Sequence, residues 1–472
     1  MHKCFWALLI SVGICTMALA QDNKEIAGKW YGVAKSYYGE KQRLTIVLEK
    51  DGEGYKGEML SPDQTEDAIS FDNVVYRKDT LLLRIDGIRF AYAGVWDPAA
   101  KLFKGVFTWN GQRSDFNLSR KETRKEDLFK RPQEPVPPYP YYTEDVTFDN
   151  QKDSVTLAAT FTRPATMGRY PVVVMISGSG PQDRNEEMAS HKTFLVLADY
   201  LARNGVASLR YDDRGVGAST GYYGDADVYD FAADTKAAVA YLKTRKDVDP
   251  YSIGLLGHSE GAIVAQIAAA NNKSVAFVVS MAGMGLTGRE LVDQRLIIDA
   301  KMAGEPDSVV SDRLHHLKPY WDALASDTNI TVAKAKAVEA LREIYRTSPD
   351  DIKNEVSEED FVNNVNLNRE LSSVLQYKPL EYLKQIKCPF MAISGSRDMQ
   401  VDATTNLNAI ERALRENGNM HVTIRKFDGL NHLFQQCKTC TVAEYGELEQ
   451  TIDPRVPEFI AHWILQLPPM AR

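Results

Sequence analysis

The sequence IGLLGHSEGAIVAQIAAA, residues 253–270, decides the fold of this chain. It begins as a short apolar strand, passes through the five residues G-H-S-E-G around Ser259, and ends as an alanine-rich helix. A G-x-S-x-G turn between a strand and a helix holds its serine on a sharp, strained bend that exposes the hydroxyl. The first turn of the helix directs free N–H groups and a positive dipole end toward the reacting atoms. The stretch therefore predicts a nucleophilic serine at position 259.

A second match to the same motif, at residues 217–221, lies in a different context. A polar run precedes it instead of an apolar strand, and the residues that follow it start no helix. Because the motif depends on its structural context, the match alone carries little weight. We interpret Ser219 as a loop residue and Ser259 as the nucleophile.

Strands and helices alternate on both sides of Ser259. Continuous apolar runs, of the kind that strands buried on both faces of a parallel sheet require, are separated by runs of helical spacing. The predicted strands are residues 171–176, 207–210, 275–280, 389–394 and 422–427, and the predicted helices are residues 194–204, 228–244, 404–417 and 456–467. This pattern predicts an α/β fold with a doubly wound sheet. Residues 285–385 are almost wholly helical in pattern, and we expect them to form an inserted cap. The predicted cap helices are residues 288–302, 307–325, 332–345 and 361–375.

The chain before residue 143 divides into three predicted parts. The leader has a polar start, an apolar run and an A-x-A cleavage pattern, which together are typical of a signal peptide. Short alternating strands then indicate a small barrel or sandwich. Residues 28–30, G-K-W, resemble the opening G-x-W of lipocalin-like barrels. A proline-rich linker follows. The predicted order is a signal peptide at 1–20, an all-β domain at 21–120, a linker at 121–142 and the α/β domain at 143–472.

Composition and cysteine content limit the partners. The 472 residues carry a formal net charge of −8, which gives no reason to expect nucleic acid as a partner. The apolar run of the leader is too short to span a bilayer, so we expect no membrane span and export to the periplasm or the exterior.

In an exported protein, Cys437 and Cys440 could form a local disulfide. A metal site would need further ligands, and a redox catalyst a thioredoxin-like setting. The oligomeric state stays open.

A nucleophilic serine needs a base that takes its proton and a third group that fixes the tautomer of that base. We expect the base to be His432, which follows the end of a predicted strand. We expect the acid to be Asp398, which follows the strand at 389–394. The weaker candidates are His421, Asp402 and Asp428.

The developing oxyanion needs backbone N–H donors that are already in place. One expected donor is the amide of Glu260, directly after the nucleophile. The other is the amide of Ser179 in the loop at 177–184, whose glycines allow close approach to a substrate. An ordinary glycine-rich turn is the alternative, and the lysine that a phosphate-binding loop requires is absent.

With these motifs the chain resembles the α/β-hydrolase superfamily over residues 143–470, in particular exported bacterial esterases with a G-S-G-P-Q-D-R loop and a G-H-S-E-G elbow. The run from Arg210 to Ser219 resembles a structural turn of that superfamily, which explains the second motif match. Ser177 stands where many relatives carry histidine. The resemblance implies that small-molecule carboxylic esters are cleaved through an acyl-enzyme, without metal or cofactor.

Two alternatives remain open. Some relatives are serine aminopeptidases, which would need carboxylates for the substrate ammonium group; Glu290, Asp293 and Asp299 are candidates in the cap. A non-catalytic binding module is the alternative from another class.

Overall fold

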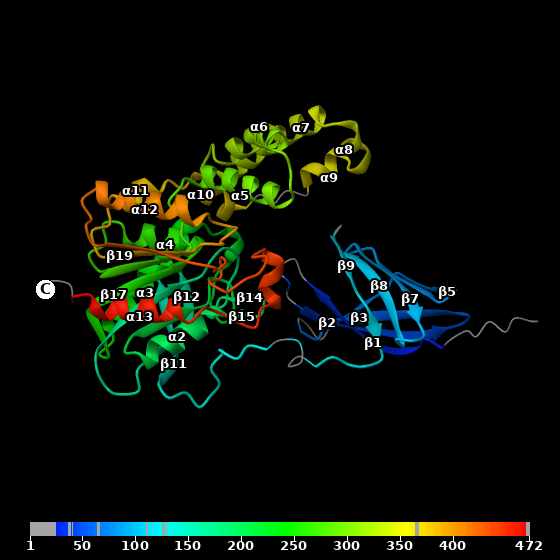
Figure 1. The fold of residues 1–472 in the computed structure, drawn as a ribbon, viewed down its shortest axis with the longest axis horizontal. Coiled ribbons are helices and arrows are strands. Elements are labelled where there is room, and N and C mark those ends of the chain that lie inside the picture. Colours follow the sequence, from blue (N-terminus) through cyan, green and yellow to red (C-terminus); the bar gives the residue numbers. More distant parts are fainter. Residues whose placement is uncertain are drawn as a thin grey trace, which may run out of the picture. The chain divides into compact units, whose positions relative to one another are not determined.

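The computed structural model describes residues 25–35, 39, 41–63, 67–109, 112–124, 128, 130–363 and 368–468. The chain forms two compact units, residues 1–34 with 42–125 and residues 35–41 with 126–472. One is built of strands, and the other combines a sheet with helices (Figure 1). The predicted signal peptide lies outside the described residues. Within the described part of the chain, no helix combines the length and apolarity that crossing a membrane requires.

The first unit is an antiparallel sheet with the strand order β4-β3-β2-β1-β10-β8-β7-β6-β5, and β9 pairs with β8. Alternate side chains face its core: in β6, Leu81 and Leu83 are buried while Leu82 is exposed. Trp30 packs edge to face on Phe103 at 4.9 Å between ring centroids. Since β3 also contacts β5, the sheet curls on itself, which fits the expected all-β unit. The strands are β1 Gly28–Lys35, β2 Lys41–Asp51, β3 Gly54–Leu60, β4 Ala68–Ser70, β5 Asn73–Arg77, β6 Thr80–Ile85, β7 Phe90–Asp97, β8 Leu102–Trp109, β9 Gln112–Asp115 and β10 Leu118–Ser119.

The second unit contains a mixed eight-stranded sheet in the order β11-β12-β16-β13-β17-β18-β19-β20. The pairs β11–β12 and β12–β16 are antiparallel, and every other neighbouring pair is parallel. Because the parallel strands share one direction, their carboxyl ends meet at one edge, where ligands bind in such sheets. The strands are β11 Tyr142–Asn150, β12 Val155–Arg163, β13 Tyr170–Ile176, β16 Ala207–Tyr211, β17 Val248–His258, β18 Phe277–Met281, β19 Phe390–Gly395 and β20 Val422–Phe427. The short strands β14 Glu187–Met188 and β15 His191–Lys192 pair with each other.

Helices cover both faces of this sheet (Figure 1). Helices α3, α4 and α12 contribute to one hydrophobic core, and α2 and α13 contribute to a second. The expected doubly wound α/β arrangement is therefore present. These helices are α2 Thr193–Arg203, α3 Val228–Thr244, α4 Glu260–Ala269, α12 Ala403–Glu416 and α13 Arg455–Gln466.

A helical segment lies between β18 and β19, as expected, and has its own small core that includes Tyr320, Leu324 and Leu341. The expectation of one continuous helix at 361–375 is wrong. Asn368 has extended backbone angles and its side chain accepts a hydrogen bond from the amide of Leu371, so a new helix begins after it. The helices are α5 Gly288–Met302, α6 Asp307–Leu324, α7 Ile330–Thr347, α8 Asp350–Glu355, α9 Glu358–Asn363, α10 Arg369–Gln376 and α11 Pro379–Leu383.

Candidate active site

Ser259 occupies the turn between β17 and α4. Its backbone has φ 53° and ψ −118°, a conformation that is strained for any residue with a side chain. The flanking glycines make the turn possible. A Cβ at Gly257 would lie 2.1 Å from the carbonyl oxygen of Gly261, and a Cβ at Gly261 would lie 2.2 Å from the carbonyl oxygen of Ile176. The strand, the serine and the helix can therefore meet this closely only with glycine at both positions.

His432 and Asp398 lie in the loops after β20 and β19, and both are buried. His432 Nδ1 is 2.8 Å from Asp398 Oδ2. The other carboxylate oxygen, Oδ1, accepts hydrogen bonds from the amides of Gln400 at 2.8 Å and Val401 at 2.9 Å. An ionised Asp398 keeps the hydrogen of His432 on Nδ1, which leaves Nε2 free to accept a proton.

The weaker sequence candidates are used elsewhere. Asp402 caps α12 by accepting a hydrogen bond from the amide of Thr405. Asp428 accepts one from the Ser396 hydroxyl, and His421 is an exposed residue before β20. Ser219 donates to the carbonyl of Asp212 at 2.7 Å and accepts from the amide of Ala158 at 2.9 Å. Ser219 therefore ties a loop to β12.

A cavity of about 440 Å³ brings the other predicted residues together. Ser259, His432, Ser179 and Glu260 line it, and Asp398 lies behind His432. The amide of Glu260 is in the first turn of α4 and has no partner within the helix. Among the described residues, no acceptor is recorded for the amides of Ser179 and Glu260, so both are free to bind an oxyanion.

Side chains hold the glycine-rich loop on either side of Ser179. The amide of Gly178 donates to Glu186 Oε1 at 2.9 Å, and the amide of Gly180 donates to Glu370 Oε1 at 3.0 Å. Ser177, which stands where many relatives carry histidine, donates a hydrogen bond from its hydroxyl to Asp213 Oδ1 at 3.0 Å.

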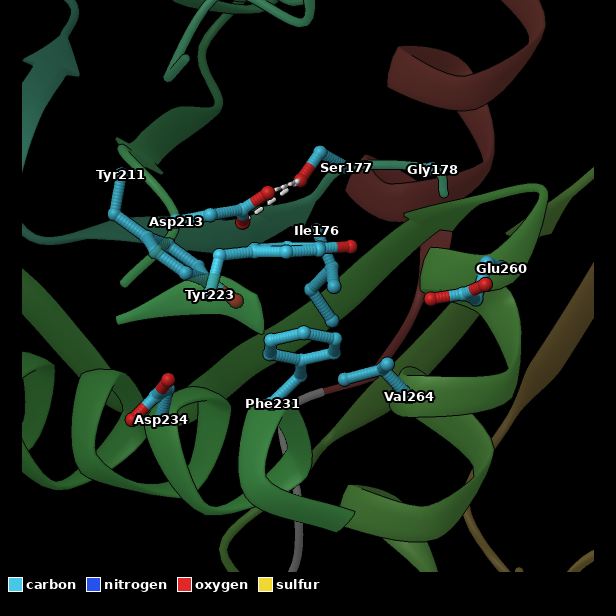
Figure 2. A pocket seen from close by; sticks show the side chains of 10 residues that line it. All are labelled: Ile176, Ser177, Gly178, Tyr211, Asp213, Tyr223, Phe231, Asp234, Glu260 and Val264. Atoms are coloured by element: carbon cyan, nitrogen blue, oxygen red, sulfur yellow. Dashed lines mark hydrogen bonds between the residues drawn. The ribbon is translucent and has the colours of Figure 1, made fainter. Parts of the chain in front are cut away.

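Several carboxyl groups lie near the cavity. Burial, followed by the neighbouring Glu370 carboxylate, raises the pKa of Glu260 well above its usual range. Burial also raises the pKa of Asp213 to about 8, against hydrogen bonds from Gln182 and Ser177 that lower it. Figure 2 shows the Ser177 hydroxyl bonded to Asp213, with Glu260 lining the same small pocket. Folding therefore favours the protonated forms of Glu260 and Asp213.

Three residues at this site were not predicted from the sequence. They are His258, which lines the cavity, and Glu186 and Glu370, which bind the glycine-rich loop. His258 lies inside the G-H-S-E-G motif, which is the one signal that could have found it. Glu186 and Glu370 reach the site from a loop and from α10, and no periodicity marks them.

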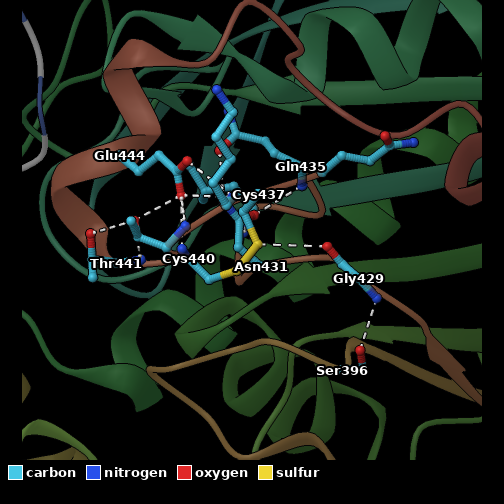
Figure 3. Close-up of a disulfide and its surroundings, with 12 residues drawn as sticks. Ser396, Gly429, Asn431, Gln435, Cys437, Cys440, Thr441 and Glu444 are labelled. Carbon is cyan, nitrogen blue, oxygen red and sulfur yellow. Dashed lines mark hydrogen bonds between the residues drawn. A yellow bond between two sulfur atoms is a disulfide. The ribbon is translucent and has the colours of Figure 1, made fainter. Parts of the chain in front are cut away.

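Cys437 and Cys440 form a disulfide in the loop that follows His432 (Figure 3). Cys437 Sγ lies 3.6 Å from the carbonyl oxygen of Gly429. The Glu444 carboxylate accepts hydrogen bonds from the amides of residues 438, 439 and 440, which stabilises this turn. No group of three or more potential metal ligands occurs within the part of the chain that the structure describes.

The mixed sheet, the helices on both of its faces and the serine on a strand–turn–helix elbow define an α/β-hydrolase. Residues 153–426, more than half of the chain, match the family described as X-Pro dipeptidyl-peptidase (S15 family). The chain belongs to this family.

The similarity to individual proteins is modest. The chain is 27% identical over 330 residues to Esterase EstD of Thermotoga maritima, an alignment that covers 69% of this chain and 70% of the relative. It is 31% identical over 137 residues to the quorum-quenching protein AidA of Acinetobacter baumannii, covering 29% of this chain and 42% of AidA. Among solved structures, the esterase Pf2001 of Pyrococcus furiosus is similar, with a TM-score of 0.41 and 19% identity over 73% of this chain and 100% of that one.

Proposed function

We propose that this protein hydrolyses carboxylic esters of small molecules through an acyl-enzyme, with Ser259 as nucleophile, His432 as base and Asp398 as the orienting acid. The observation that carries the proposal is the 2.8 Å contact between His432 and Asp398 beside the cavity that Ser259 lines. The name of the relative EstD supports ester chemistry. The disulfide between Cys437 and Cys440 supports an oxidising location, such as the periplasm or the exterior.

The reaction follows from the proton positions. Nε2 of His432 takes the hydroxyl proton as Ser259 Oγ bonds to the ester carbon. The carbonyl oxygen becomes an oxyanion, which the amides of Ser179 and Glu260 stabilise. The bond to the alcohol then breaks, and His432 gives its proton to the departing oxygen. A water molecule, deprotonated by His432, next attacks the acyl-enzyme and releases the acid with Ser259 restored.

The cavity suits a modest apolar acyl group. Its apolar lining comes from Met188, Met284, Leu371 and Val374. The purified enzyme should hydrolyse acetyl to hexanoyl p-nitrophenyl esters, with kcat/KM falling for longer chains. A fluorophosphonate should label the wild type and leave Ser259→Ala unlabelled. An active Ser259→Ala variant would refute the assignment of the nucleophile.

A second candidate is a serine peptidase that recognises a free amino terminus, and it is favoured by the family and by one specific observation. Glu370 lines the cavity beside Glu260, and its carboxylate could bind an ammonium group. The cap carboxylates considered from the sequence are engaged locally instead. Glu290 caps α5, Asp293 pairs with Arg289, and Asp299 pairs with Arg295.

The two candidates differ in what Glu370→Gln should do. The glutamine can still accept the hydrogen bond from Gly180, so the loop is kept while the charge is removed. Under the ester proposal, the variant should retain its rate on acetyl esters, and aminoacyl and X-Pro p-nitroanilides should be poor substrates. If the anilides are cleaved faster than the esters, and both N-acetylation of the anilide and Glu370→Gln abolish that rate, the peptidase reading replaces the ester reading.

A further inference from the structure

His258 and Glu186 form a buried pair directly behind the proposed catalytic residues. The exposed fractions of their surfaces are 2% and 1%. His258 Nδ1 is 2.8 Å from Glu186 Oε1, and the same oxygen accepts the amide of Gly178 at 2.9 Å. On its other side, His258 Nε2 is 3.1 Å from the carbonyl oxygen of His432. One chain of hydrogen bonds thus joins the glycine-rich loop at 177–184, called the oxyanion loop below, to the backbone of the proposed base.

The atoms in this chain fix where the protons are. A carbonyl oxygen only accepts, so Nε2 of His258 carries a hydrogen. Glu186 Oε1 already accepts from Gly178, so its contact with Nδ1 needs one further hydrogen between them. Against the effect of burial, the charge and hydrogen bond of Glu186 raise the pKa of His258, which leaves that hydrogen on Nδ1. His258 is then an imidazolium beside a carboxylate, and the pair has no net charge.

We propose that His258 and Glu186 are positioning residues, which through this shared proton hold the oxyanion loop and the backbone of His432 in register. This inference rests on the ester hydrolase function proposed above. The pair acts through its hydrogen bonds to the amide of Gly178 and the carbonyl oxygen of His432, and these contacts engage both ring nitrogens of His258. It is distinct from the Asp398–His432 contact, which orients the ring of His432, whereas His258 binds its carbonyl oxygen.

The backbone at Glu186 supports a specific role. Its φ of 50° lies in the left-handed region, which is costly for a glutamate. Its amide donates to the carbonyl of Asp183 at 2.9 Å, and Asp183 Oδ1 accepts from the amides of Asn185 and Glu187, so the turn is firmly held. Among the described residues, Glu186 Oε2 has no hydrogen-bond partner. Stability alone does not account for a strained, buried and half-satisfied carboxylate.

Neighbouring charges affect how tightly the pair keeps its proton. Burial alone would lower the pKa of His258, but the charge and hydrogen bond of Glu186 outweigh it, so the pKa lies above the usual value. The carbonyl of His432 and the Asp398 carboxylate act in the same direction. Asp213 faces Glu186 from the loop after β16. At sufficiently high pH the pair loses its proton, breaks one hydrogen bond and leaves a negative charge behind the oxyanion loop. Hydrolysis should therefore decline on the alkaline side.

The test compares Glu186→Gln and His258→Asn with the control His421→Asn, an exposed histidine outside the site. Initial rates on p-nitrophenyl acetate are measured from pH 6 to pH 10, with the active fraction counted by fluorophosphonate labelling. We expect kcat to fall about 100-fold in both variants with KM nearly unchanged, as misplacement of about 1 Å produces. The alkaline decline should shift to lower pH in Glu186→Gln and vanish in His258→Asn. A decline unchanged from wild type in folded variants overturns the proposal.

A measurement on the wild type decides the matter if the variants do not fold. The protein has 8 histidines, so ring ¹⁵N shifts can be followed individually. One histidine should still carry hydrogens on both ring nitrogens at a pH at which free imidazole has lost its proton, and the absence of any such histidine overturns the proposal. The hydrolase function is tested separately, because it fails if wild-type Ser259 is not labelled, whatever the ring nitrogens show.

Discussion

The sharpest consequence of the site geometry concerns Asp398→Asn. The amides of Gln400 and Val401 both donate to Oδ1, so this position must remain an acceptor. An asparagine satisfies them only with its carbonyl oxygen there, which puts its NH₂ group at the position of Oδ2. That group then donates to His432 Nδ1, 2.8 Å away in the wild type. The structure thus fixes which way the amide faces.

The tautomer of the base is inverted as a result. With Nδ1 accepting, the hydrogen of His432 moves to Nε2, which can no longer take the proton of Ser259. The same change in a serine protease triad keeps the geometry and lowers kcat about 10⁴-fold. That factor corresponds to about 5 kcal/mol in the activation free energy. The stability should change little, because the substitution is isosteric and both backbone hydrogen bonds remain.

The assay is the hydrolysis of p-nitrophenyl acetate with Asp402→Asn as the matched control. Asparagine caps helices as well as aspartate does, so the control should keep its activity. Melting temperatures of both variants should stay close to that of the wild type. If folded Asp398→Asn retains more than about a tenth of the wild-type kcat, the tautomer argument is wrong. Equal losses in the two variants would move the acid to another residue.

Four further outcomes are expected. Ser219→Ala should lower stability by about 1–3 kcal/mol in thermal melts, because its two buried partners are left unpaired, yet keep kcat, whereas Ser259→Ala should lose it. Gly261→Ala should cost about 3 kcal/mol or more by denaturant titration, since its Cβ would meet a backbone oxygen of β13 at 2.2 Å. Folding raises the pKa of Asp213 from 3.8 to about 8, so its stabilising contribution is present below pH 3.8 and is lost as the pH rises to 8; Asp213→Asn should flatten this part of the curve of melting temperature against pH. Cys440→Ser should lower unfolding free energy by about 2 kcal/mol, the chain-entropy value for so short a loop.

The sequence was informative where local chemistry decides the structure. Gly257 and Gly261 are required by close backbone contacts, and these contacts arise from the strand–turn–helix path itself. Asp398 and His432 follow apolar runs that form β19 and β20, and neighbouring parallel strands end at the same edge of a sheet. The alternation of strands and helices was therefore enough to predict the class of fold. It also predicted which loops meet.

The sequence was silent where partners come from distant segments. Glu186 and His258 are 72 residues apart, and their contact depends on a turn with a left-handed residue that no pattern indicates. Glu370 reaches the loop at Gly180 across 190 residues. The break at Asn368, which sets where α10 begins and hence which way Glu370 faces, was predicted as helix interior. A charge on a helix has no sequence signal that separates a cavity wall from a solvated face.

Several carboxyl groups lie close to the proposed oxyanion site, and their protonation and hydrogen bonds determine how strongly they would repel an oxyanion. An oxyanion beside Ser179 would be repelled by nearby charges on Glu260, Glu186 and Asp398, because such repulsion is strong at low dielectric. The charge of each of these three carboxyl groups is reduced or balanced in a different way. Burial and the neighbouring Glu370 carboxylate favour the protonated form of Glu260, and Glu186 is paired with His258. Asp398 contacts His432, which in the proposed mechanism becomes cationic as the oxyanion forms. Protonation states as well as residue types therefore set the negative charge near the loop at 177–184, and activity in this protein should be more sensitive to alkali than the triad alone requires.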